Sequence, residues 1–254
     1  MIGPHPAEEA RDGSNRRIRA LLFDLYDTLI WLDVEQSNEG REQLAGRLGV
    51  PLEEFLRVWL RSVDDRMRGK GGQLADHLAA TASTLGVEPT PDLVAELVAI
   101  ERRRLERSVH LYPGTVPTLK RLRAAGYRLG LLSNVSDGAA IPITHLGLDQ
   151  LFDELMLSHE VGLLKPEPAI FELACRRLGV TLAETMFVAD GGFGELDAAH
   201  QMGIFSVLLE QDGQSKDYGF STRYDVKIRD LRELERLIPP PIHPEPGGDL
   251  CSSP

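Results

Sequence analysis

The residues with the clearest chemical potential are carboxylates that follow directly on short apolar runs. Asp24 comes after the run 20–23, and Asp190 comes after the run 186–189, with Glu195 five residues further on across a glycine-rich turn. Carboxylate oxygens are the ligands that hard cations prefer, and a carboxylate can also act as a covalent nucleophile. The spacing of Asp190 and Glu195 suits coordination of a hard cation, although Asp and Gly are also common in simple turns.

Two further apolar runs are also followed by reactive side chains. Ser133 and Asn134 end the run that begins at Leu129, and Lys165 lies a few residues beyond the run 155–157, directly before Pro166. Taken singly, a Ser-Asn pair is more often a helix N-cap or a turn, and a lone lysine is usually solvated. Together, the segments place Asp, Ser, Lys and an Asp/Glu pair after four successive apolar runs, a combination that is hard to obtain by accident.

The elements that must position these side chains are buried strands alternating with helices. Short apolar runs bounded by turn or polar residues predict strands at 20–23, 129–132, 155–157, 186–189 and 205–209. Helical patterns at 113–125, 168–178 and 196–202 lie between them, each followed by a glycine. This alternation predicts an α/β fold with a doubly wound, Rossmann-like parallel sheet. In such sheets ligands bind beyond the carboxyl ends of the strands, where the reactive residues fall.

The segment 33–107 breaks the alternation because it is helical throughout. Helical patterns at 43–48, 52–66, 73–85 and 91–107 are separated by glycine-containing breaks. We therefore predict a helical cap inserted after the first strand, over the carboxyl ends of the sheet. The core domain then comprises 18–32 and 108–238, and the polar or Pro- and Gly-rich tails 1–17 and 239–254 are predicted to be disordered.

Composition excludes several classes of protein. The 254 residues carry 28 basic and 39 acidic side chains, a net charge of −11, which disfavours a nucleic-acid partner. No apolar run approaches the ~20 residues of a membrane helix, and residues 1–17 lack the apolar core of a signal peptide. Two cysteines do not make a disulfide framework, so we expect a cytoplasmic protein with no membrane partner. The oligomeric state stays open.

The order of these motifs resembles the haloacid dehalogenase superfamily over about residues 18–238. Asp24 with Thr28 looks like the first motif of that family, Ser133 the second, Lys165 the third, and Asp190 with Glu195 the fourth. The helical insertion resembles the C1-type cap of its members.

The resemblance implies a magnesium-dependent hydrolase of a small phosphorylated metabolite. Asp24 would form an aspartyl-phosphate intermediate, and Ser133 and Lys165 would stabilise the phosphoryl oxygens. The implied Mg²⁺ ligands are Asp24, the backbone carbonyl of Tyr26, Asp190 and Glu195, with Glu195 acting through water or by holding Lys165. The implied substrate-binding residues are Tyr26, Thr28 and Asn134.

One position departs from the phosphatase pattern. Phosphatases of the family usually have an aspartate two residues after the nucleophile, where it acts as general acid and base, and here that residue is Tyr26. Asp27 is one residue too far, and strand alternation should turn it away from the site. A tyrosine with a pKa of about 10 is a poor proton donor at neutral pH.

Three functions remain open on this evidence. The dehalogenases of the family carry Tyr at this position, but they use no metal, and the run 29–32 offers no arginine while Arg41 is remote. A phosphatase is preferred whose leaving group needs little protonation, or whose acid comes from the cap or from the substrate. Metal ligation is specific, whereas a missing acid slows the reaction only about 10²–10⁴-fold. The third alternative is a non-catalytic binding or regulatory protein. The presence of all four motifs argues against it.

Overall fold

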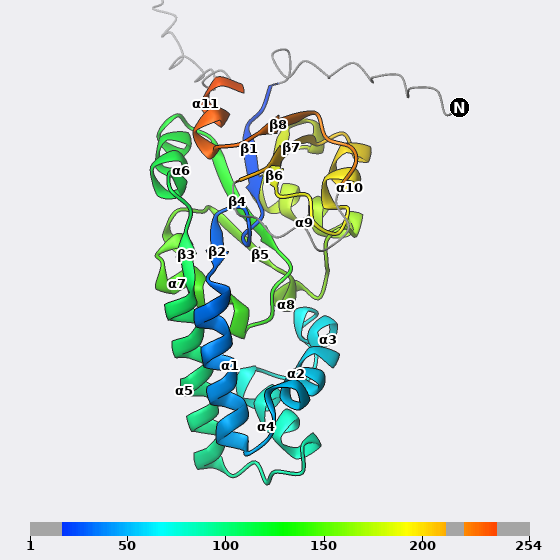
Figure 1. The fold of residues 1–254 in the computed structure, drawn as a ribbon. Helices are drawn as coiled ribbons and strands as arrows, with labels where there is room; N and C mark the ends of the chain where they lie inside the picture. The colour runs from blue at the N-terminus through cyan, green and yellow to red at the C-terminus, as the bar shows by residue number, and fades with distance from the viewer. Residues whose placement is uncertain (1–16, 212–220, 238–254) are drawn as a thin grey trace, which may run out of the picture.

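A six-stranded parallel sheet forms the centre of the molecule. The structure is a computed structural model that describes residues 17–211 and 221–237. The strands follow the order β5-β4-β1-β6-β7-β8 (Figure 1). They are β1 (Ala20–Phe23), β4 (Arg128–Ser133), β5 (Glu154–Leu157), β6 (Thr185–Ala189), β7 (Phe205–Leu209) and β8 (Val226–Ile228). The predicted parallel sheet is confirmed, and β1 lies inside it, paired with β4 and β6.

Helices cover both faces of this sheet, which explains why its strands are continuous apolar runs. Leu21 and Phe23 of β1 pack into one buried cluster, and Ala20 and Leu22 pack into another on the opposite face. The first cluster includes residues of α6 (Thr115–Ala124), α7 (Ile141–His145) and α11 (Leu234–Leu237). The second includes residues of α9 (Pro168–Leu178) and α10 (Glu195–Gln201). The sheet is therefore doubly wound, as predicted.

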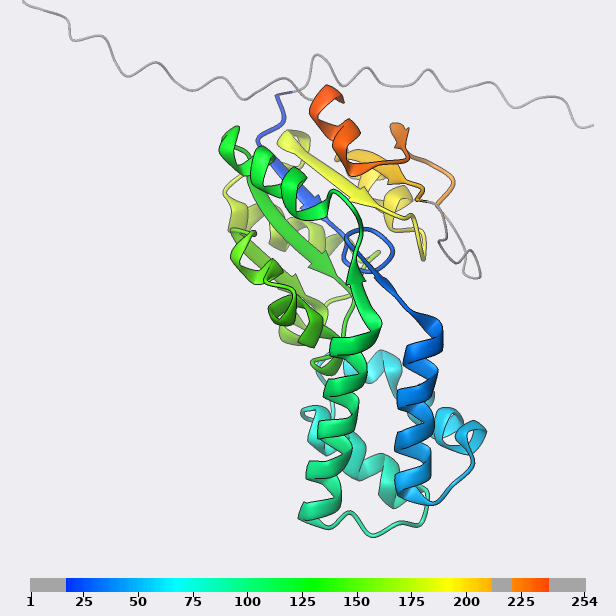
Figure 2. The same ribbon diagram turned by 60° about the vertical axis from the view of Figure 1, so that its left-hand side comes forward.

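Five helices follow the first strand and form the predicted cap. They are α1 (Val34–Leu48), α2 (Leu52–Arg61), α3 (Val63–Met67), α4 (Leu74–Thr84) and α5 (Pro91–Ser108). Figure 2 shows them extending away from the end of the sheet at which the strand arrows point. The cap has its own apolar cluster, which includes Leu44, Phe55, Leu78 and Leu97. The cap thus lies beyond the carboxyl ends of the strands.

The cap helices differ in their bounds from the sequence prediction. Helix α1 begins at Val34 rather than at residue 43, because the Asp33 side chain accepts the N–H of Gln36 at 3.0 Å and caps the helix. The predicted helix 52–66 is two helices, α2 and α3, interrupted at Ser62.

Three short strands were not predicted. β2 (Ile30–Leu32) and β3 (Val109–Leu111) form an antiparallel ribbon that carries the chain into and out of the cap. The third is β8 at the edge of the main sheet. Each has three residues, too few to show a period, and the β2–β3 pairing joins segments on either side of the whole cap.

Two polar contacts hold the cap against the core. The Arg68 guanidinium lies 2.6 Å from Glu167, in the loop that follows Lys165. The backbone N–H of Leu74 donates to the Asp137 carboxylate at 2.5 Å. Both contacts join the α3–α4 region to loops at the carboxyl edge of the sheet.

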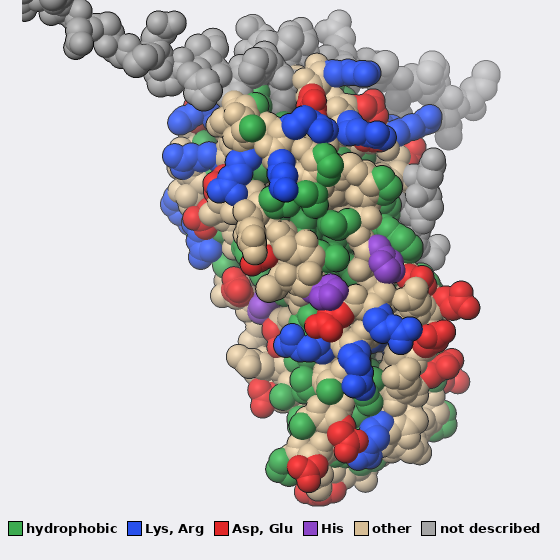
Figure 3. Space-filling view, turned by 90° about the vertical axis from the view of Figure 1, so that its left-hand side faces the viewer, with side chains coloured by type: hydrophobic (Ala, Val, Ile, Leu, Met, Phe, Trp, Pro, Cys, Tyr) green, Lys and Arg blue, Asp and Glu red, His purple; other side chains and the backbone are tan. Residues whose placement is uncertain are grey.

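Charged side chains are distributed unevenly over one face of the molecule (Figure 3). Figure 3 shows Lys and Arg side chains gathered at the core end of one face and both charge types on the cap, so the acidic excess is not spread evenly over this face. Within the described ranges, no helix is both long and apolar enough to cross a membrane. The segments predicted to be disordered, 1–17 and 239–254, lie outside the described residues except for Arg17.

Candidate active site

Asp24 lies directly after the central strand of the sheet. Its backbone N–H continues the ladder beyond β1 by donating to the Val188 carbonyl at 3.0 Å. The Asp24 side chain is only 10% exposed. An interior strand, paired on both sides, therefore presents this carboxylate at the carboxyl edge of the sheet.

Thr28 links Asp24 to the strand beside it. Its hydroxyl donates to Oδ2 of Asp24 at 3.4 Å and accepts the backbone N–H of Asp190 at 3.1 Å. The Thr28 side chain is fully buried. The structure thus places Thr28 behind the two carboxylates, where it fixes their separation, rather than on the surface that a ligand would meet.

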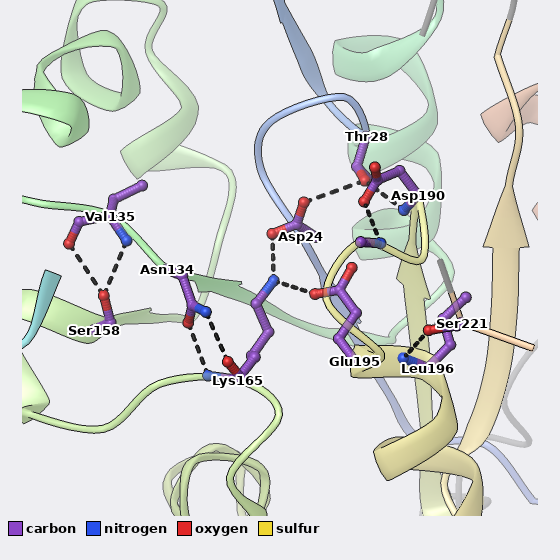
Figure 4. Close-up of polar contacts among 11 residues, drawn as sticks. Asp24, Thr28, Asn134, Val135, Ser158, Lys165, Asp190, Glu195, Leu196 and Ser221 are labelled. Carbon is purple, nitrogen blue, oxygen red and sulfur yellow. Dashed lines mark hydrogen bonds and ion pairs between the residues drawn. The ribbon is translucent and has the colours of Figure 1, made fainter. Parts of the chain in front are cut away.

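Lys165 provides the positive charge at this edge. Its ammonium contacts Asp24 and lies 2.6 Å from Oε2 of Glu195 (Figure 4). Burial alone would lower the pKa of Lys165, but the two carboxylates outweigh it and raise that pKa above its usual value. The ammonium therefore stays charged at neutral pH.

Asn134 fixes the backbone of Lys165. Its amide nitrogen donates to the Lys165 carbonyl at 2.8 Å, and its amide oxygen accepts the Lys165 N–H, also at 2.8 Å. The neighbouring Ser133, at the end of β4, is 2% exposed and lines the same cavity. Asn134 was predicted to bind substrate, and both halves of its amide are engaged with Lys165.

Asp190 and Glu195 flank the glycine-rich turn after β6. Oδ1 of Asp190 accepts the N–H of Gly192 at 3.1 Å, which ties the carboxylate to its own turn. Burial, followed by the charge of Asp24, raises the pKa of Asp190 to about 6. Burial likewise raises the pKa of Glu195, and Lys165 opposes this shift.

These carboxylates fit a divalent cation. Asp24, Asp190 and Glu195 each offer an oxygen, and the three oxygens lie within 4.8 Å of one another. Three ionised carboxylates and one ammonium sum to −3 + 1 = −2. Burial is the main cause of the raised pKa values of Asp190 and Glu195, and the negative charge of Asp24 adds to both shifts. A bound cation would offset this repulsion, and all-oxygen donors suit Mg²⁺.

Tyr26 faces the cavity but its hydroxyl is used elsewhere. The phenol donates to the Ala139 carbonyl at 3.0 Å, and the ring packs against the apolar cluster of the core. Burial raises the pKa of Tyr26 well above its usual value, with smaller effects from Arg104 and Glu101. Tyr26 therefore keeps its proton and directs it toward a backbone oxygen.

The expectation that Asp27 turns away from the site is wrong. Asp27 lies on the cavity wall, and its φ of 57° is in the left-handed region. Strand alternation does not apply there, because β1 ends at Phe23 and Asp27 belongs to the turn that follows.

The cavity is small, and most of the side chains that line it carry polar groups. Its volume is about 100 Å³. The described residues that line it all belong to the core: Asp24, Tyr26, Asp27, Ser133, Asn134, Lys165, Asp190, Gly192, Phe193 and Glu195. Sequence analysis did not single out Phe193, although a large aromatic residue inside a run of glycines was an available signal.

The fold and this arrangement define a hydrolase with a doubly wound α/β core and a helical cap. The chain belongs to the haloacid dehalogenase-like hydrolase family, whose sequence model matches residues 18–203. The resemblance seen in the sequence is thereby confirmed.

The proteins similar to this chain include phosphatases and haloacid dehalogenases. The chain is 30% identical over 225 residues to a glyceraldehyde 3-phosphate phosphatase of Methanopyrus kandleri, covering 86% of this chain and 94% of that protein. It is 28% identical over 228 residues to (S)-2-haloacid dehalogenase 4A of Burkholderia cepacia, covering 87% and 95%. A 2-haloacid dehalogenase structure from Pseudomonas syringae is similar in fold, with a TM-score of 0.66, 24% identity and coverage of 87% and 97%.

Proposed function

We propose that the protein is a magnesium-dependent phosphatase that acts on a small phosphorylated metabolite through an aspartyl phosphate on Asp24. The observation that carries this proposal is the cluster of Asp24, Asp190 and Glu195, whose oxygens lie within 4.8 Å of one another beside the Lys165 ammonium. The similarity to a glyceraldehyde 3-phosphate phosphatase supports the phosphoryl substrate class. The low cysteine content supports a cytoplasmic location.

Phosphoryl transfer would proceed in two steps at Asp24. A carboxylate oxygen of Asp24 bonds to phosphorus while the bond from phosphorus to the leaving-group oxygen breaks, and the leaving group keeps the electron pair. Water then attacks phosphorus, which releases inorganic phosphate, restores the Asp24 carboxylate and passes a proton to solvent. The Lys165 ammonium and the Ser133 hydroxyl stabilise the phosphoryl oxygens as charge shifts between them.

A metal ion would be held by Asp24, Asp190, Glu195 and the backbone carbonyl of Tyr26. When bound there, Mg²⁺ supplies positive charge that lets an anionic nucleophile approach an anionic phosphate. Glu195 also holds Lys165 in place through their 2.6 Å contact.

The leaving group should be one that departs with little protonation. Tyr26 occupies the position of the usual acid, but its pKa is raised and its hydroxyl donates to Ala139. Acyl phosphates and aryl phosphates meet this requirement better than alkyl phosphates do, since their leaving groups are weaker bases.

A 2-haloacid dehalogenase is the second candidate. Tyr26 and the similarity to haloacid dehalogenases favour it, because halide leaves without a proton. The acidic cluster disfavours it, and Arg41 bonds to Asn38 on α1 and does not line the cavity. A haloacid carboxylate would therefore meet these carboxylates, and Lys165 is the one cation among the described residues that line the cavity.

The test compares the wild type with Asp24→Asn and Asp190→Asn. Phosphate release from acetyl phosphate, phenyl phosphate and glycerol phosphate is measured with Mg²⁺ and with EDTA, and chloride release from 2-chloropropionate is followed in parallel. We expect magnesium-dependent phosphate release that disappears in both variants. Chloride release in EDTA would establish the dehalogenase instead, and turnover of neither class would favour a binding role.

A further inference from the structure

We propose that the cap holds a second binding site, which takes a phosphate group in a cavity between α2, α3 and α4. The described residues that line this cavity all belong to the cap, and none of them lines the active-site cavity. Its volume is about 400 Å³, about four times that of the active-site cavity. The ligand is either inorganic phosphate or the phosphate monoester of a small molecule. This site is independent of the chemistry proposed for Asp24.

The lining of this cavity is basic, although the chain as a whole is acidic. Among the described residues, Arg61, Arg66 and Lys70 line it with a single carboxylate, that of Asp65. These four residues carry a net charge of +2, against −11 for the chain. Lys70 lies 3.2 Å from Asp65, so the excess belongs to the two arginines. A phosphate monoester carries about −1.5 to −2 at neutral pH and would balance this excess.

Arg66 is a buried cation that has no ion-pair partner among the described residues. The residue is 4% exposed. Its Nη1 donates to the Trp59 carbonyl and to the Ser62 hydroxyl, each at 2.6 Å, and its guanidinium carbon lies 3.9 Å from the centroid of the Trp59 ring. Burial lowers the pKa of Arg66, and the charges of Glu101 and Asp137 oppose this shift only in part. A bound anion would supply the missing counter-charge.

Two buried nitrogen atoms in the side chains that line this cavity have no hydrogen-bond partner among the described residues. They are Nε of Arg66 and Nε2 of His77, and His77 is only 7% exposed. The other two such side-chain atoms of the described residues are oxygens, of Asp149 and Asp225, which do not line this cavity. Buried polar groups are nearly always hydrogen-bonded, and a bound ion is one explanation where the protein offers no partner. A ligand that accepts hydrogen bonds would satisfy both nitrogens.

The arrangement of these donors favours a phosphate over a carboxylate. Arg61 lies on α2, Arg66 on α3 and His77 on α4, so the donors come from three elements. The hydrogen bonds of Arg66 use Nη1, which leaves Nε and Nη2 for the two-pronged contact that arginine makes with phosphate. His77 adds a donor when its Nε2 carries a proton. A tetrahedral phosphate presents oxygens in several directions, whereas the two oxygens of a carboxylate lie in one plane.

The test follows the fluorescence of Trp59, whose ring contacts the Arg66 guanidinium. The chain has two tryptophans, so Trp31→Phe leaves Trp59 as the sole reporter. Inorganic phosphate and glycerol phosphate are titrated separately in EDTA, and acetate and chloride are titrated at matched ionic strength. Without a divalent metal, the carboxylates of the active-site cavity repel phosphate, so the response reports on the cap. Failure of the proposed phosphatase function would therefore leave this result unchanged.

We expect a saturable change with phosphate or its monoester, and the tighter of the two identifies the form of the ligand. In the same background, Arg66→Met should weaken binding at least about tenfold and Arg61→Gln about threefold. Arg57→Gln is the matched control and should change binding less than about twofold, because Arg57 is exposed on the same helix as Arg61 but does not line the cavity. Arg61 is also exposed, so Arg61→Gln keeps the test valid if Arg66→Met does not fold. The absence of a saturable change, an equal response to acetate or chloride, or equal losses in Arg61→Gln and Arg57→Gln would overturn this proposal.

Discussion

The Lys165 ammonium lies 2.6 Å from Oε2 of Glu195, and both side chains are at most 6% exposed. The same ammonium contacts Asp24, so one cation is shared by two buried carboxylates from different strand ends. Both carboxylate side chains are largely removed from solvent, at 10% exposed for Asp24 and 6% for Glu195. Loss of the shared cation would therefore leave two buried charges without their partner.

Replacing Lys165 by Met should strongly destabilise the metal-free protein. Removing one partner of a buried ion pair typically costs about 3–5 kcal/mol, because the remaining charge is uncompensated. Urea unfolding in EDTA should show a loss of this size, and Mg²⁺ should recover part of it by supplying positive charge to the same carboxylates. Lys120→Met, at an exposed position of α6, is the control. Equal stabilities of the two variants in EDTA would contradict the role given to Lys165.

Tyr26→Phe should leave the chemistry almost unchanged. The Tyr26 hydroxyl donates to Ala139 and is not directed at a leaving group. We expect kcat/KM for aryl phosphates within about threefold of the wild type, and a loss of about 1 kcal/mol in the free energy of unfolding from the lost hydrogen bond. Steady-state kinetics and urea unfolding measure the two effects. A fall of a hundredfold or more in kcat would show that the phenol acts as the acid after all.

Gly69→Ala should weaken the docking of the cap on the core. Gly69 has a φ of 70°, and a Cβ there would collide with the backbone carbonyl of His159 in α8 (Ser158–Val161). Gly49 has nearly the same φ, 71°, but a Cβ there would meet nothing within 4 Å. Both variants carry the left-handed penalty of about 1–2 kcal/mol, so the excess loss in Gly69→Ala measures the collision. Thermal unfolding of the two variants makes the comparison. Equal shifts in Tm would contradict the close contact between Gly69 and the His159 carbonyl.

His77→Gln should reduce the sensitivity of the fold to mild acid. Burial lowers the pKa of His77, with smaller opposing effects from nearby groups such as Asp137. The unfolded chain then takes up a proton near pH 6.5 that the folded chain refuses, so stability is lost as the pH falls below that value. Thermal unfolding at pH 7.5 and 5.5 should show a smaller drop in Tm for His77→Gln than for the wild type. An equal drop would mean that His77 takes up its proton in the folded state as readily as in the unfolded chain.

Much of the site could be predicted because its residues follow buried strands. Asp24, Ser133 and Asp190 each come directly after a run whose apolar character is a local property of the sequence. Their convergence then follows from the parallel sheet, whose carboxyl ends share one edge. The same local reasoning located α9 at 168–178 to the residue, since Pro168 and Gly179 mark its ends.

The other features of the site and the fold could not be predicted, because they depend on long-range contacts or on local backbone conformation. The Tyr26 hydroxyl bonds to Ala139, 113 residues away, so its role could not be inferred from the motif around it. Asp27 was misplaced because strand alternation was applied four residues beyond the end of the strand, in a turn with left-handed backbone. The β2–β3 ribbon is too short to leave a pattern, and its two strands lie on either side of the whole cap in the sequence.

Because Asp24 directly follows β1, its backbone hydrogen bond should open no more often than the interior of the sheet does. Strands at the edge of a sheet can fray, but β1 pairs on both sides along its length. The Asp24 amide, bonded to Val188, should exchange its hydrogen with solvent only when the whole domain opens. Asp24, the proposed nucleophile, is therefore expected to lie in the last part of the molecule to open.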